Sequence, residues 1–372
     1  MSLKRFTDYT KLDQTLFEIA GTLETNLIKF INPQNMEEQK EKFFTAIEKN
    51  EIYNPFFSYT PRNPLYAYFS MSPKLETFKN ELKERLKDIE HTDLGIVFES
   101  EIIDLIEKIE MIKSIGTENF SGNTESYYEN ISKSEIKSAK EILQIKVEEK
   151  ETIIPFDSAT GAIKEFLKKK RLPYTITIRE PAGSRFAVVN SRKEILINKD
   201  TVFTKEMLKR LIAHEIETHI YRYENGLRQP YKILAHGFSR ETIETEEGLA
   251  ACVEKLKGVS SKNQIREYAG RVIAIHTAQG KSFYETFKEM QNYFDNDAAF
   301  RLTVRAKRGI KYQDQTGAFF KDAVYFKGML KVENFLKDRK IEELYLGKYS
   351  IYDIPLVKSI PGLKEPKYLP EF

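Results

Sequence analysis

Two histidines bracket a glutamate in the HEIETH segment at residues 214–219, in a chain of 372 residues that contains five histidines. This pattern is typical of a catalytic zinc site, where both imidazoles bind the metal and the glutamate beside the first histidine polarises the zinc-bound water. The more common form of the motif spaces its histidines four residues apart, whereas here the spacing is five. The alternative is a pair of ordinary core or surface histidines on a helix.

The spacing of five constrains the helix that carries the motif. In a regular α-helix each residue turns by about 100°, so His214 and His219 would lie about 140° apart and could not bind one ion. A π-type turn holds about 4.4 residues and would bring the two imidazoles to within roughly 50° of each other. We therefore predict a π-bulge or an equivalent widened turn between His214 and His219.

The residues around the motif predict a buried helix. Thr204 can cap its start, and Asn225-Gly226 supplies a stop signal. Apolar residues keep helical periodicity along this segment at Leu211, Ile212, Ile216, Ile220 and Tyr223.

A catalytic zinc ion usually has a third protein ligand, and Glu247 is the best candidate. It lies in the segment TEEGLA at residues 245–250, where Thr245 can act as the N-cap of a second helix. Gly248 costs about 1 kcal/mol relative to alanine inside a helix, which suggests a close approach to the helix of the motif. The alternative is that Glu246 and Glu247 merely complement the positive end of a helix dipole.

Together these segments resemble the tyrosine carboxypeptidase family, which includes the microtubule-associated tyrosine carboxypeptidases and bacterial proteins described by a QEGLA motif. The resemblance rests on HEIETHIYRYENG, on Gln229-Pro230 and on EEGLA at residues 246–250. It extends to NPFFSY at residues 54–59, Arg308-Gly309 and KDAVY at residues 321–325, and so covers roughly residues 20–335.

Membership of that family implies a zinc metallopeptidase that removes a C-terminal aromatic residue. His214, His219 and the glutamate before the glycine of the motif would bind one Zn²⁺ ion, and Glu215 would be the general base. Glu246 stands where the motif name has glutamine, which leaves two adjacent glutamates as possible ligands. We favour Glu247, because an acidic residue directly before glycine is the third ligand in other zinc peptidases.

The rest of the chain predicts an α+β fold that is mainly helical and zincin-like. Residues 1–150 carry amphipathic stripes and are expected to form a helical N-terminal region, with an exposed loop at residues 116–130. Residues 151–372 are expected to form the catalytic domain. Strands are predicted at residues 174–179 and, as a hairpin, at 185–190 and 194–198. In a zincin-type lobe one sheet edge borders the cleft and can receive an extended peptide, although the hairpin alone fits a cover for the core equally well.

A carboxypeptidase must bind a free carboxylate, for which the arginine side chain is well suited. Arg222 lies three residues after His219. Three further arginines share one face of a helix expected to begin near Asp297, although an arginine stripe is more often solvated. They are Arg301, Arg305 and Arg308.

Three other residues are assigned by their surroundings. Tyr325 either stabilises the oxyanion of the tetrahedral intermediate or fills core. His276, on an apolar face, and His236, in a loop-like Ala-His-Gly, are expected to be structural.

Composition suggests a cytoplasmic protein without an affinity for nucleic acid or membranes. The 59 basic and 56 acidic residues are mixed along the sequence and give a net charge of +3. No run of eighteen apolar residues exists, and the first residues lack the apolar stretch of a secretory signal. The single cysteine, Cys252, excludes an internal disulfide.

The sequence therefore predicts a zinc metallocarboxypeptidase that acts on a peptide or protein C-terminus. Glu215 would take a proton from the zinc-bound water and pass it to the leaving amine. One alternative is a regulatory or binding protein of the same fold without turnover. Another is a zinc hydrolase of a non-peptide amide.

Overall fold

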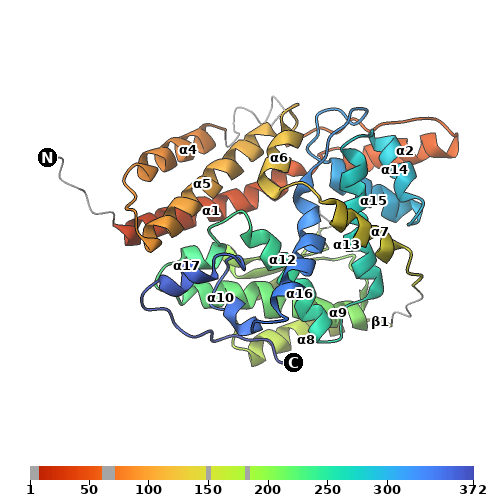
Figure 1. Cartoon of the computed structure of the whole chain (residues 1–372). Coiled ribbons are helices and arrows are strands. Elements are labelled where there is room, and N and C mark those ends of the chain that lie inside the picture. The colour runs from red at the N-terminus through yellow and green to blue at the C-terminus, as the bar shows by residue number, and fades with distance from the viewer. Residues whose placement is uncertain (1–7, 61–71, 148–151, 181–184) are drawn as a thin grey trace.

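The computed structural model describes residues 8–60, 72–147, 152–180 and 185–372 (Figure 1). Buried apolar side chains from all four ranges form one hydrophobic core. The expected domain boundary at residue 150 lies outside the described residues. Within these ranges, no helix combines the length and the apolar composition that a membrane span requires.

The N-terminal part of the chain is helical, as predicted, and all of its labelled helices except α7 lie in the upper part of Figure 1. Local signals start several of them: the Asp8 side chain accepts from the backbone N–H of Lys11 at the start of α1, and Ser132 forms a capping box with Glu135 in α7. These helices are α1 (Tyr9–Ile31), α2 (Met36–Glu48), α4 (Ser72–Leu86), α5 (Asp93–Ser114), α6 (Phe120–Tyr128) and α7 (Lys133–Leu143).

The prediction of an exposed loop at residues 116–130 is wrong. Most of this segment forms α6, because Phe120, Thr124, Tyr127 and Tyr128 point inward and are buried against the core. The polar composition of the segment belongs to its outer face.

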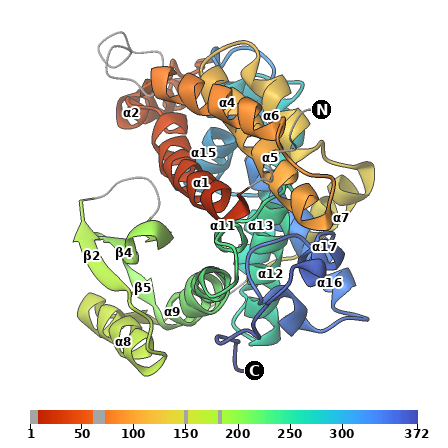
Figure 2. The same cartoon turned by 90° about the vertical axis from the view of Figure 1, so that its left-hand side faces the viewer.

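The strands form two small sheets. β1 (Ile153–Ile154) pairs antiparallel with β5 (Phe203–Thr204). In the second sheet β4 (Glu194–Asn198) lies between β2 (Thr175–Arg179), which is parallel to it, and β3 (Phe186–Val189), which is antiparallel. The predicted hairpin is confirmed, with its turn formed by the short 3₁₀ helix η2 (Asn190–Arg192). Figure 2 shows β2, β4 and α8 together, on the side opposite α16 and α17.

Helices make up most of the remaining chain, which confirms a mainly helical α+β architecture. The Thr204 hydroxyl accepts from the backbone N–H of Met207, so the predicted cap of the histidine-bearing helix is confirmed. The elements up to α12 are α8 (Phe156–Lys169), α9 (Lys205–Leu211), η3 (Ile212–Ile220), α10 (Tyr221–Leu227), α11 (Ile233–His236) and α12 (Thr242–Leu256). They are followed by α13 (Lys262–Ala278), α14 (Phe283–Met290), α15 (Asn296–Lys307), η4 (Phe320–Ala323), α16 (Val324–Phe335), η5 (Ile341–Leu344) and α17 (Ile354–Ser359).

Helix α12 begins earlier than the sequence predicted. Thr245 is not its N-cap but lies inside the helix, where its Oγ1 atom accepts from the backbone N–H of Ile351. Gly248 does allow a close approach, but the partner is α16: a Cβ atom on Gly248 would lie 2.1 Å from the carbonyl carbon of Gly328. The small residues therefore set the distance between α12 and α16.

The histidine-bearing helix ends at Leu227, one residue after the predicted stop at Asn225-Gly226, and Gly226 also has a packing role. It lies within α10, and a Cβ atom there would lie 2.2 Å from the carbonyl oxygen of Leu234. Asn225 bonds the C-terminal segment instead, accepting from the backbone N–H groups of Lys367 and Tyr368. The end of the histidine-bearing helix is thus fixed by segments that follow it in the chain.

Candidate metal and active site

The histidines lie on a π-helix, η3, which confirms the widened turn predicted from their spacing. The backbone N–H of Tyr221 bonds the carbonyl of Ile216 five residues earlier. Thr218 donates from its hydroxyl to the carbonyl of Ala213, also five residues earlier, at 3.0 Å. As a result the ring centroids of His214 and His219 are 4.9 Å apart.

Helix α12 brings Glu247 to the same point. One ligand atom from each of His214, His219 and Glu247 lies within 4.8 Å of the other two. The Nε2 atoms of His214 and His219 are 3.5 and 3.7 Å from Oε2 of Glu247, too far for good hydrogen bonds. Oε2 of Glu247 is buried and has no hydrogen-bond partner.

The other nitrogen of each imidazole is held by a carboxylate. Nδ1 of His214 lies 2.6 Å from Oε1 of Glu254, and Nδ1 of His219 lies 2.8 Å from Oε1 of Glu246. A carboxylate can only accept, so each Nδ1 donates its proton there, and each Nε2 is left facing Glu247, where it can bind a proton or a metal ion. This arrangement fits a metal ion, because histidine ligands commonly donate their second N–H to a carboxylate.

The charges in the cluster also suit a cation. Burial lowers the pKa of His214, but its contacts with Glu247 and Glu254 outweigh burial and raise it to about 10. Burial raises the pKa of Glu247, but the neighbouring His214 and His219 bring it below its usual range. The carboxylates therefore favour positive charge between them, whether a proton or a metal supplies it.

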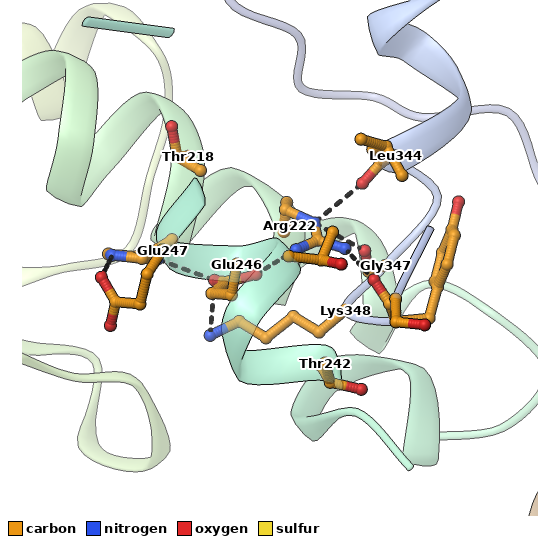
Figure 3. A network of polar contacts seen from close by, with 12 residues as sticks. Thr218, Arg222, Thr242, Glu246, Glu247, Leu344, Gly347 and Lys348 are labelled. Atoms are coloured by element: carbon orange, nitrogen blue, oxygen red, sulfur yellow. Dashed lines mark hydrogen bonds and ion pairs between the residues drawn. The ribbon is translucent and has the colours of Figure 1, made fainter. Parts of the chain in front are cut away.

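Glu246 is fixed from the opposite side by basic residues. Burial raises its pKa, but the charges of Lys348, Arg222 and His219 outweigh burial and lower it. Nζ of Lys348 lies 3.1 Å from Oε1 of Glu246, and Arg222 forms an ion pair with Oε2. Figure 3 shows Glu246 between Glu247 and Arg222. Of the two adjacent glutamates, Glu247 faces the histidine nitrogens and Glu246 orients one of the histidines.

Arg222, which was expected to bind a substrate carboxylate, points into the protein interior. Its side chain is fully buried, and its Nε atom donates to the carbonyls of Leu344 and Gly347 at 2.8 and 2.9 Å. Its Nη2 atom donates to the carbonyl of Tyr349 at 2.8 Å. Arg222 therefore ties the histidine-bearing helix to the C-terminal segment.

A pocket of about 360 Å³ opens over the cluster and is lined by Glu215 and Tyr325 as well as by His214, His219 and Glu247. One wall is the edge strand β3, through Phe186, Ala187 and Val188. Another wall is apolar and comes from α1, α5, α6 and α12, with Leu23, Leu27, Ile112, Tyr127 and Ile243. The pocket thus combines the ligand cluster, a sheet edge and an apolar surface.

A model of one protein family, described as microtubule-associated tyrosine carboxypeptidase, matches residues 29–372. The chain belongs to this family.

Individual relatives agree with this assignment. The chain is 27% identical to microtubule-associated tyrosine carboxypeptidase 1 of Mus musculus over 356 residues, which cover 92% of this chain and 64% of the mouse protein. The protein of the same name from Rattus norvegicus is 27% identical over 354 residues, with the same two shares covered. The Homo sapiens protein is 33% identical over 178 residues, which cover 45% of this chain and 36% of that protein. The chain spans less than two thirds of the length of these relatives.

The arginines expected to bind a carboxylate lie outside the pocket lining. Helix α15 carries two of them and is followed directly by Arg308, close to the positions predicted. Arg301 is half exposed and bonds Glu267, whereas Arg305 and Arg308 contact Asp322. The basic residues that line the pocket are Lys108, Arg240, Lys321 and Lys348.

The remaining histidines are placed in two different ways. His236 ends α11, lines the pocket and packs against Phe17 and Tyr223, with ring centroids 4.6 and 5.7 Å apart. His276 is exposed on α13, so its expected place on an apolar face is wrong.

Glu254 was not predicted from the sequence. It follows Glu247 by two helical turns on α12, so both carboxylates lie on the face that meets η3. Its role could have been predicted from its position, because it is a glutamate on the buried face of a helix, two turns after a possible metal ligand.

Proposed function

We propose that this protein is a zinc-dependent carboxypeptidase that removes a C-terminal aromatic residue from a peptide or protein. The observation that carries the proposal is the convergence of two histidine Nε2 atoms on Oε2 of Glu247, a buried carboxylate oxygen without a hydrogen-bond partner. The names of the relatives, which are tyrosine carboxypeptidases, support the choice of substrate.

His214, His219 and Glu247 would hold the metal. Two imidazole nitrogens and one carboxylate oxygen form a ligand set that zinc peptidases use, with a further position left for water or substrate. When bound, zinc supplies Lewis acidity for the scissile carbonyl and makes water a stronger acid. Glu246 and Glu254 keep both histidines in the tautomer and orientation that metal binding requires.

Glu215 and Tyr325 perform the proton transfer and charge stabilisation in this proposal. Glu215 follows His214 directly and lines the pocket beside the ligand cluster. Its carboxylate accepts a proton from the attacking water and later donates it to the leaving amine. The hydroxyl of Tyr325 donates a hydrogen bond to the oxygen that becomes negative when the carbonyl is attacked.

The substrate main chain pairs with the edge strand β3. In the sheet β3 is bonded on one side to β4, and three of its residues line the pocket. An extended peptide can add to such an edge through backbone hydrogen bonds. The apolar wall of the pocket then receives the terminal aromatic side chain.

Lys321 receives the terminal carboxylate. Lys321 lines the pocket, as does Tyr325, which follows it by four residues in the chain. Burial raises the pKa of Glu247, and the charge of Lys321 is among those that oppose this effect, which places the ammonium group near the ligand cluster. An ion pair with the carboxylate of the last residue would restrict cleavage to the C-terminal bond.

The test is mass spectrometry of peptides that differ in their last residue, incubated with the zinc-loaded wild type and with Glu215→Gln. We expect release of single terminal residues, mainly tyrosine and phenylalanine. Glu215→Gln should keep the metal and lose at least about a hundredfold in rate, because an amide cannot accept the proton.

A matched control is Glu217→Gln in the same motif, since Glu217 is buried and bonded to Lys257 outside the pocket lining. It should retain the turnover of the wild type. Stoichiometric zinc without cleavage of any peptide would contradict the proposal and favour a binding protein of the same fold.

A further inference from the structure

Arg271 lies on α13, and its guanidinium is buried but incompletely bonded. The residue is 7% exposed. Its Nη2 atom lies 3.2 Å from Oε1 of Glu267, whereas Nε and Nη1 have no hydrogen-bond partner. Buried N–H groups without partners destabilise a fold, and a methionine of similar length would avoid that cost. Packing alone therefore does not explain an arginine at this position.

The guanidinium contacts two tyrosines that stack on each other. The ring centroids of Tyr268 and Tyr325 are 5.3 Å apart, with 19° between the ring planes. Cζ of Arg271 lies 4.3 Å from the centroid of the Tyr325 ring and 5.1 Å from that of Tyr268. A cation over an aromatic face is attracted to the ring. The contact thus restrains Tyr325, which lines the pocket.

Several arginines lie close to Arg271 and share its carboxylate partners. Four guanidiniums share two carboxylates: Arg271 and Arg301 contact Glu267, while Arg305 and Arg308 contact Asp322. Two of these arginines also act on the phenol of Tyr325. Burial and the charge of Glu247 raise the pKa of Tyr325, whereas Arg271 and Arg305 act in the opposite direction. The Tyr325 hydroxyl is therefore within electrostatic range of both Glu247 and the arginines.

We propose that Arg271 is a positioning residue for Tyr325. Its side chain holds the Tyr325 ring at the pocket wall, and its charge favours the negative charge that develops on the substrate oxygen bonded by the Tyr325 hydroxyl. This inference rests on the proposed carboxypeptidase function. It assigns Arg271 an effect on the rate of the chemical step, exerted through Tyr325, and no contact with the substrate.

The experiment is a double-mutant cycle of Arg271→Met and Tyr325→Phe, measured as kcat and KM on a peptide ending in tyrosine with zinc-loaded proteins. We expect Arg271→Met to lower kcat by about ten- to a hundredfold while KM changes by less than about threefold. In the Tyr325→Phe background the same change should lower kcat by less than about twofold. Arg271→Lys, which keeps the charge, should recover most of the loss.

Two further measurements separate this role from a structural one. Arg266→Met on the same helix removes an arginine that lies over the Phe294 ring, and it should leave kcat unchanged. In the Glu215→Gln background, calorimetry should give the same Kd for the peptide with and without Arg271→Met.

Several results would overturn the inference while leaving the proposed zinc-dependent carboxypeptidase activity intact. One such result is an unchanged kcat in Arg271→Met or in Tyr325→Phe. Another is that Arg271→Met lowers kcat equally in the wild-type and Tyr325→Phe backgrounds. A third is that Arg271→Met changes only KM or only the Kd of the peptide. A wild type that holds zinc and cleaves no peptide would overturn the proposed function, and this inference with it.

Discussion

Glu254 accepts a hydrogen bond from Nδ1 of His214 at 2.6 Å, across 40 residues of sequence. The glutamate lies on the helix that also supplies Glu247, so α12 contributes both a proposed metal ligand and the support of another proposed ligand, His214. The position of α12 against η3 therefore determines the geometry of the whole cluster.

Replacing this support should weaken metal binding. We expect Glu254→Gln to lower zinc affinity by about ten- to a hundredfold, because the amide no longer fixes the histidine tautomer. Competition with a chromogenic chelator measures the affinity. Glu244→Gln is the matched control on the same helix, since Glu244 pairs with Lys331 away from the cluster. Equal affinities for Glu254→Gln and wild type would remove Glu254 from the metal site.

The π-helix can be tested through Thr218, whose hydroxyl bonds the Ala213 carbonyl. We expect Thr218→Val to lower the free energy of unfolding by about 1–3 kcal/mol and also to weaken zinc binding, because a buried carbonyl loses its partner at the widened turn. Urea denaturation and the chelator assay measure the two effects.

Thr303→Val provides the comparison in a regular helix. Thr303 is equally buried and bonds the Ala299 carbonyl four residues earlier at 2.8 Å. The Thr303→Val variant should have a lower free energy of unfolding and an unchanged zinc affinity. If both variants keep the affinity of the wild type, the hydroxyl of Thr218 does not shape the metal site.

Arg222 should act on stability rather than on substrate binding. We expect Arg222→Met to lower the free energy of unfolding by about 3–5 kcal/mol, because Glu246 then keeps a buried charge without this partner. Arg228→Met is the control, since Arg228 bonds one exposed carbonyl and should change stability by less than about 0.5 kcal/mol. A stable Arg222→Met protein with a raised KM would instead restore the substrate role predicted from the sequence.

The substrate end depends on a charge pair in the proposed mechanism. We expect Lys321→Met to raise KM for a peptide with a free C-terminus by about ten- to a hundredfold, since a charged hydrogen bond is lost. Steady-state kinetics should show no such effect for Lys331→Met, because Lys331 pairs with Glu244 in the wild type and does not line the pocket. Amidation of the peptide should abolish cleavage by the wild type. Equal cleavage of the amide and the free acid would indicate an endopeptidase.

The sequence predicted the histidine helix well, because its geometry follows from the angle per residue. A spacing of five cannot bring His214 and His219 together on an α-helix, so a π-turn was required. The predicted strands also agree, because their alternation is local.

Features that depend on tertiary packing were not predictable in the same way. Periodicity identified the arginine face of α15, but it did not reveal that Arg305 is paired with Asp322. The start of α12 was misplaced because Thr245, a good N-cap by type, is bonded to a distant segment. Composition likewise suggested a loop at residues 116–130, although Phe120 buries its ring in the core.

The tether between Arg222 and the C-terminal segment has a consequence for the order of events during synthesis. The carbonyl of Leu344 that Arg222 binds is added 122 residues later. A growing chain thus contains both histidines and Glu247 well before the C-terminal segment that Arg222 binds has been synthesised. Contacts between residues so far apart in sequence form slowly. For a time, the nascent protein therefore contains the proposed metal ligands but not the C-terminal contacts that hold their helix in place. We therefore expect stable binding of the proposed zinc ion only in the completed fold.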